Sequence, residues 1–101
     1  MSNISDVIIE EDLLAYLGID YADDMVLKNI ERAIAYADGE LRESVSDDYP
    51  VDHPLTPELA LLYASTSYEN RALDGNELKR AEQIALKLKL YLRRRSNVQT
   101  V

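Results

Sequence analysis

Few residues in this chain of 101 have side chains that could bind a metal ion or perform catalysis. The single histidine, His53, lies close in sequence to three aspartates, Asp47, Asp48 and Asp52, and the four together could weakly hold a divalent cation. The spacing lacks the central glycine and terminal glutamate of a calcium-binding loop, and Pro50 interrupts it. We therefore favour a solvated acidic loop over a metal site.

Other catalytic arrangements find no support in the residue types. The chain contains no cysteine, which excludes disulfides, thiolate zinc sites and a cysteine nucleophile. One histidine cannot form a paired-histidine zinc motif, and Ser65 and Ser67 have no histidine within helical reach for a hydrolytic triad. Three scattered glycines cannot form a phosphate-binding loop. The sequence predicts a protein that is not an enzyme and has no cofactor.

Charge is distributed unevenly along the chain. Residues 1–58 contain 15 acidic and 3 basic side chains, net −12, whereas residues 59–101 contain 4 acidic and 8 basic ones, net +4. Five bases and no acid lie between residues 87 and 95; they are Lys87, Lys89, Arg93, Arg94 and Arg95. An acidic body opposes general nucleic-acid binding, but this basic terminus could meet a phosphate or an acidic partner.

Hydrophobic periodicity predicts an all-α fold, a small single domain of about four helices. The helices are expected over residues 10–17, 22–45, 57–73 and 77–94. Gly18 should end the first helix, Asp20 should cap the second, Thr56 should cap the third and Asn76 the fourth. Residues 46–55 contain two prolines and three acids, so we expect an irregular segment there.

The third and fourth predicted helices depart from an ordinary amphipathic pattern. Residues 59–68 carry no charge, so the third helix should be central and buried. The fourth, in the basic C-terminal part at 77–101, also alternates as a strand would, but its strong helix formers favour a helix. Its expected inward stripe is Leu78, Ala81, Ala85, Leu88 and Leu92. Leu86 and Leu90 then lie outside that stripe, where another protein surface should cover them.

Two segments resemble the head-tail connector proteins of tailed bacteriophages, the head-completion adaptors that lie below the portal. The first is the run from Glu11 to Asp20 (EDLLAYLGID), which Asp23-Asp24 and a long amphipathic helix follow. The second is the proline-started helix with Leu61-Leu62-Tyr63-Ala64, which ends in Tyr68-Glu69-Asn70-Arg71. Together the two segments cover about residues 9–73, and their order and spacing make the resemblance moderately specific.

The resemblance implies a structural protein that assembles as a homo-oligomeric ring, expected to be a dodecamer, and continues the DNA channel from portal to tail. The implied partners are the portal protein, a tail-proximal connector or stopper protein, and further copies of the chain. DNA would pass through the lumen without specific binding. The implied location is the head-tail interface of the virion, after assembly in the host cytoplasm. No membrane is involved, and the longest charge-free stretch is too short to cross one.

We predict that the C-terminal helix binds protein, either the portal or a neighbouring subunit. The predicted binding residues are Leu86, Lys87, Lys89, Leu90, Arg93, Arg94 and Arg95. The motif Tyr68, Glu69, Asn70 and Arg71 is expected to be structural, with Tyr68 packing under the second helix and Glu69 or Arg71 pairing with a neighbouring element or subunit.

Two other interpretations remain open. A stand-alone DNA- or RNA-binding module would contact phosphates through the fourth helix and Arg93-Arg94-Arg95, which explains the basic end and nothing else. The seven tyrosines are too spread out to indicate an aromatic platform for bases. A small acidic regulator that binds one partner protein would explain the spare leucines but not the two connector-like segments.

Overall fold

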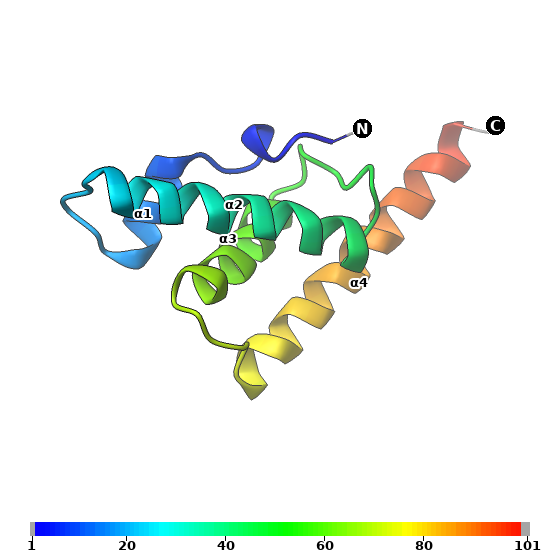
Figure 1. The fold of residues 1–101 in the computed structure, drawn as a ribbon. Coiled ribbons are helices and arrows are strands. Elements are labelled where there is room, and N and C mark those ends of the chain that lie inside the picture. The colour runs from blue at the N-terminus through cyan, green and yellow to red at the C-terminus, as the bar shows by residue number, and fades with distance from the viewer. Residues whose placement is uncertain (1, 100–101) are drawn as a thin grey trace.

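The computed structural model describes residues 2–99 and shows only helical elements within that range. A short 3-10 helix, η1 (Ile4–Asp6), precedes the four α helices. These are α1 (Glu10–Leu17), α2 (Asp24–Ser44), α3 (Leu55–Tyr68) and α4 (Gly75–Gln99). In Figure 1, α1 lies at one end of the molecule and the C-terminal half of α4 extends at the other. The predicted all-α fold class is confirmed, whereas η1 was not predicted.

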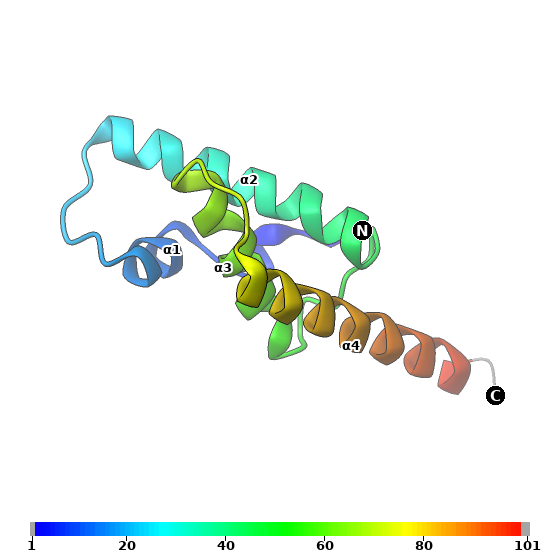
Figure 2. The same cartoon turned by 90° about the horizontal axis from the view of Figure 1, so that it is seen from below.

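The central helix is α3, as predicted. It packs against α1, α2 and α4, and it lies between α2 and α4 in Figure 2. Eight of its 14 residues are buried, because α3 carries its own apolar and small side chains on nearly all of its faces. Three of the buried residues, Thr56, Ser65 and Thr66, carry side-chain hydroxyls on Ser or Thr. Ser65 and Thr66 satisfy their hydroxyls by donating to the carbonyl oxygens of Leu62 and Tyr63 in the preceding turn.

Two flanking helices bury one stripe each at helical spacing. The buried residues of α2 are Ile30, Ala33, Ala37 and Leu41. Those of α4 are Ala81, Ile84, Ala85 and Leu88. The spacing in α4 confirms a helix rather than the alternative strand pattern. Leu78, which the predicted stripe included, is nearly half exposed, because it lies in the first turn of α4, before the part that packs on the body.

The first two α helices begin and end close to the predicted residues. Gly18 ends α1 in a left-handed conformation with φ 72°, as expected for a glycine at this position. The start of α2 lies two residues later than predicted, and Asp20 is not its cap. The carboxylate of Asp23 accepts the N–H of Val26 at 2.9 Å instead.

The start of α3 also differs from the prediction. α3 begins two residues early, at Leu55, and Thr56 is not its N-cap. The buried Thr56 hydroxyl donates to the carbonyl oxygen of Pro50 at 2.6 Å, which ties the helix to the preceding segment. Nδ1 of His53 accepts the N–H of Leu55 at 3.1 Å, which is the role of a capping side chain. Residues 46–54 are irregular, as predicted.

At its other end, α3 stops at Tyr68, five residues earlier than predicted. Asn70 adopts a left-handed conformation with φ 54°, which a helix cannot continue through. Its N–H donates to the carbonyl of Ser67 at 3.1 Å, and the N–H of Arg71 donates to the carbonyl of Thr66 at 3.0 Å. These two bonds form a Schellman motif and satisfy the last carbonyls of the helix.

Asp74 rather than Asn76 caps α4. Its carboxylate accepts the N–H of Glu77 at 2.8 Å, and the Glu77 carboxylate accepts the N–H of Asp74 at 3.1 Å. This reciprocal capping box starts the helix at Gly75. The helix continues to Gln99, five residues beyond the predicted end.

The segment before α1 is held against α2 by polar contacts. Arg42 donates through Nη2 to the carbonyl oxygen of Ser2 at 2.8 Å. The buried Tyr49 donates to Asp38 at 2.7 Å, and the Ser2 hydroxyl donates to the Tyr49 carbonyl. Burial first, and then the hydrogen bond to Asp38, raise the pKa of the Tyr49 phenol well above its ordinary value. Ile8 anchors the segment in the core.

Candidate protein-interaction surfaces

The outward side of α4 exposes two large apolar side chains. Leu86 is 58% exposed and Leu90 is 39% exposed. At roughly 100° per residue, both lie on the opposite side of the helix from the fully buried Leu88. They are four residues apart and therefore adjacent along the helix surface. The structure thus places these two predicted residues together and facing solvent.

Four basic side chains flank the two leucines. Helical spacing places Lys89 and Arg93 on one side of the leucines, and Lys87 and Arg94 on the other. All four are exposed, and none forms an ion pair or hydrogen bond with another described residue. We call this surface, the two leucines with the four bases, the α4 strip.

Arg95 does not belong to the α4 strip, although it was predicted with the others. Its Nη1 lies 3.7 Å from Oδ1 of Asp52, and its guanidinium lies 5.4 Å from the centre of the Tyr91 ring. The His53 ring meets Tyr91 edge-on, with centroids 4.8 Å apart. Arg95 therefore faces the irregular segment before α3 and links it to α4.

Two of the four residues considered for a weak cation site, Asp52 and His53, have other partners. Asp52 pairs with Arg95, and Nδ1 of His53 accepts a backbone N–H. Within residues 2–99, no group of three or more histidine and carboxylate side chains could hold a metal ion. The same part of the chain contains no helix with the length and hydropathy needed to span a membrane.

The predicted structural motif forms the corner between α3 and α4. Arg71 donates twice to the Glu77 carboxylate, at 2.6 and 3.1 Å, and once to Glu69 at 3.1 Å. The hydrogen bonds from Arg71, and then the one from the N–H of Asp74, lower the pKa of Glu77 to about 2. The hydrogen bonds to Glu77, and then to Glu69, raise the pKa of Arg71. Tyr68 packs at the edge of the core. The motif therefore ends one helix and holds the first turn of the next.

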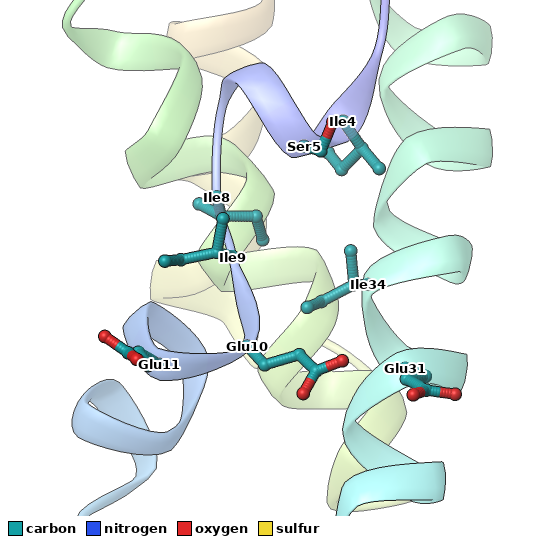
Figure 3. A pocket seen from close by; sticks show the side chains of 8 residues that line it. All are labelled: Ile4, Ser5, Ile8, Ile9, Glu10, Glu11, Glu31 and Ile34. Carbon is teal, nitrogen blue, oxygen red and sulfur yellow. The ribbon is translucent and has the colours of Figure 1, made fainter.

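A second surface feature was missed in the sequence. A pocket of about 440 Å³ lies between η1, the start of α1 and the middle of α2. It is lined by Ile4, Ile9 and Ile34 and rimmed by Glu10, Glu11 and Glu31. Figure 3 shows the Ile34 side chain facing the pocket and the Glu10 and Glu31 carboxylates at one end of it. We call this feature the acidic pocket.

Within residues 2–99, the acidic pocket is neither neutralised nor closed by other side chains. None of its three glutamates forms an ion pair with another residue of the described part of the chain. Ile9 is 49% exposed, although an isoleucine in water is unfavourable. The run Val7-Ile8-Ile9 followed by acids was the signal in the sequence, but it is too short to show a period. An apolar hollow with a negative rim is suited to a basic, apolar partner.

Comparison with known proteins gave no match: no family model fits the chain, and no curated protein or solved structure is significantly similar to it. Its function is therefore inferred from its own sequence and surfaces.

Proposed function

We propose that the protein is a structural subunit of a phage head-tail connector. In this function it forms a ring below the portal, joins the DNA-filled head to the tail and continues the DNA channel. The observation that carries the proposal is the double role of α4. One face of this helix packs into the core, while the other presents an apolar strip with basic flanks that stays exposed among the described residues.

The chemistry of the α4 strip suits a protein partner better than a nucleic acid. The free energy falls when another apolar surface covers Leu86 and Leu90 and removes them from water. The flanking bases orient a partner and speed its encounter, whereas buried leucines slow dissociation. The acidic N-terminal half would repel DNA, as the wall of a channel that DNA slides through should do.

The segments that resemble connector proteins also support the proposal. The corner at residues 68–71 holds the first turn of α4 through the Arg71–Glu77 pair. It therefore helps to set the direction in which the α4 strip leaves the body. A connector needs such a defined direction, because its subunits must all present the same surface at the same angle.

Attachment to portal-containing heads tests the proposal. Leu86→Asp combined with Leu90→Asp should abolish attachment at any salt concentration, because it removes the apolar anchors. Replacing Arg93, Arg94 and Arg95 with glutamine should weaken attachment partially and reduce its sensitivity to salt. Leu78→Asp is the matched control, since Leu78 is 47% exposed on the same helix but outside the strip. Electron microscopy of the portal with the parent protein should show an added ring.

A gel shift with duplex DNA on the same variants separates the competing functions. A nucleic-acid-binding module predicts the reverse ranking, with tight binding that falls steeply with salt and is lost only with the arginines. Sub-micromolar DNA binding by the parent in physiological salt, with that ranking, would contradict the connector proposal. A small acidic regulator would instead bind one partner in a discrete complex and add no ring to the portal.

A further inference from the structure

The acidic pocket and the α4 strip are chemically complementary. The pocket combines isoleucines with three glutamates, the strip combines two leucines with four bases, and none of these charged groups has an ion-pair partner in the described part of the chain. We propose that the acidic pocket of one copy of this chain receives the α4 strip of a second copy. This inference rests on the proposed function and deepens it, because it names the contact that joins neighbouring subunits.

The two surfaces cannot meet within one molecule. The pocket lies beside the start of α1, and the strip lies on the C-terminal half of α4, which extends from the other end of the molecule in both views (Figures 1 and 2). The molecule is 51 Å long, and α4 is a single continuous helix that cannot fold back. A contact between two different surfaces is heterologous, so repeated copies form a ring when the rotation closes.

Charge selects this pairing over a symmetric one. A two-fold contact between two α4 strips would bring four unpaired bases from each copy together, and like charges at an interface are unfavourable. The groove of about 410 Å³ between α2, α3 and α4 is also a poorer acceptor. Its lining carries charges of both signs, Glu40 and Glu82 with Lys89, and it borders Leu86 itself. The acidic pocket has charges of one sign only.

The apolar parts of both surfaces supply the attraction. Ile9 in the pocket and Leu86 in the strip are each about half exposed, 49% and 58% of the residue surface. Burial of both in one contact removes that surface from water, which is the main source of affinity in protein association. Glu10 and Glu31 come from two different helices, so they can meet bases on both sides of the leucines.

Two variants, each lacking one surface, test the contact. The strip variant carries Leu86→Asp and Leu90→Asp and keeps the pocket. The pocket variant carries Glu10→Lys and Glu31→Lys and keeps the strip. Isotope-labelled strip variant is titrated with unlabelled pocket variant while amide resonances are recorded. We expect saturable shifts at residues 4–11 and 31–34, and at least about tenfold weaker binding when the added protein lacks both surfaces. Added protein that carries Leu78→Asp besides the pocket changes should bind as the pocket variant does.

Sedimentation of the same proteins gives a second measurement. The parent should self-associate as its concentration rises, each variant alone should stay monomeric, and an equimolar mixture should stop at the dimer. Shifts that are absent or confined to α4 overturn the inference. A parent that stays monomeric at the concentrations used for resonance measurements overturns it too, as does a mixture that stays monomeric while the parent assembles.

Head attachment is scored separately, so that the two proposals can fail independently. If the variants do not pair but the parent still binds portal-containing heads, this contact is wrong and the connector function stands. If the variants pair as expected but no protein binds heads, the self-docking contact is correct and the connector function is wrong.

Discussion

The two faces of α4 place the same residue type in opposite environments. Leu88 on the inward face is fully buried, whereas Leu86 and Leu90 on the outward face are 58% and 39% exposed. All three have the same intrinsic preference for a helix, so propensity cannot separate their roles. Contact with the body separates them. The comparison teaches that one helix can stabilise the fold with one face and remain available for assembly with the other.

Polar contacts follow the same division. The inward side of α4 is tied to the body by Arg80, which donates twice to Glu58, at 2.9 and 3.0 Å. Its first turn is held by Arg71 through Glu77. The four bases of the α4 strip form no such contacts with the described residues. Changes on the inward side should therefore alter stability, and changes on the outward side should alter association.

The largest effect is expected for the buried leucine. Leu88→Ala should lower the free energy of unfolding by about 3 kcal/mol, because it removes buried methyl groups and leaves a cavity. Leu90→Ala, two residues away on the outward face, should change it by less than about 0.5 kcal/mol. Urea unfolding followed by circular dichroism measures both. Equal losses would break the distinction between the two faces.

The cap of α4 should have the next largest effect. Asp74→Ala should lower the free energy of unfolding by about 1 kcal/mol, because the N–H of Glu77 loses its acceptor. Asn76→Ala is the control and should change it by less than about 0.5 kcal/mol. The reverse ranking would show that Asn76 caps the helix, as the sequence alone suggested.

Acid should loosen the corner that orients α4. The pKa of Glu77 is about 2 in the folded protein and near 4.5 ordinarily, so the ionised form favours folding. The stability that this carboxylate contributes is complete above about pH 5 and is lost as the pH falls from about 4.5 toward about 2. Unfolding measured across this range should therefore weaken less steeply in Glu77→Gln than in the parent.

Glu82→Gln is the control for the acid prediction. Glu82 is exposed on the same helix and forms no ion pair with a described residue. Its variant should keep the pH dependence of the parent, and a Glu77→Gln variant that does the same would contradict the role of the corner.

The smallest expected change in stability distinguishes Arg95 from the neighbouring arginines. Arg95→Gln should lower the free energy of unfolding by at most about 0.5 kcal/mol, because its ion pair with Asp52 is long and half exposed. Arg94→Gln should leave stability unchanged and should weaken association instead. Thermal unfolding in low salt resolves the pair of variants best, since salt screens exposed charges. A larger loss of stability for Arg94→Gln than for Arg95→Gln would place Arg94 on the inward side of α4.

Local preference misidentified three N-caps, for two different physical reasons. Asp20, Thr56 and Asn76 are all good capping residue types, and each was predicted to begin a helix. The Thr56 hydroxyl instead donates to the carbonyl oxygen of Pro50, which only the packed segment brings within reach. In the other two cases a neighbouring aspartate captures the free N–H. Propensity therefore identifies the candidate caps, and contacts with nearby residues or with the packed body decide which side chain accepts the free N–H.

The sequence by itself determined the all-α fold, the buried third helix and the outward position of Leu86 and Leu90. These follow from periodicity and composition, which act over a few turns of one helix. Only the tertiary structure decided the acidic pocket, because its wall joins Ile4 to Glu31 across three different elements. It also decided that Arg95 meets Asp52, far back along the chain. Contacts between distant segments depend on how the helices pack, and packing is a property of the whole chain.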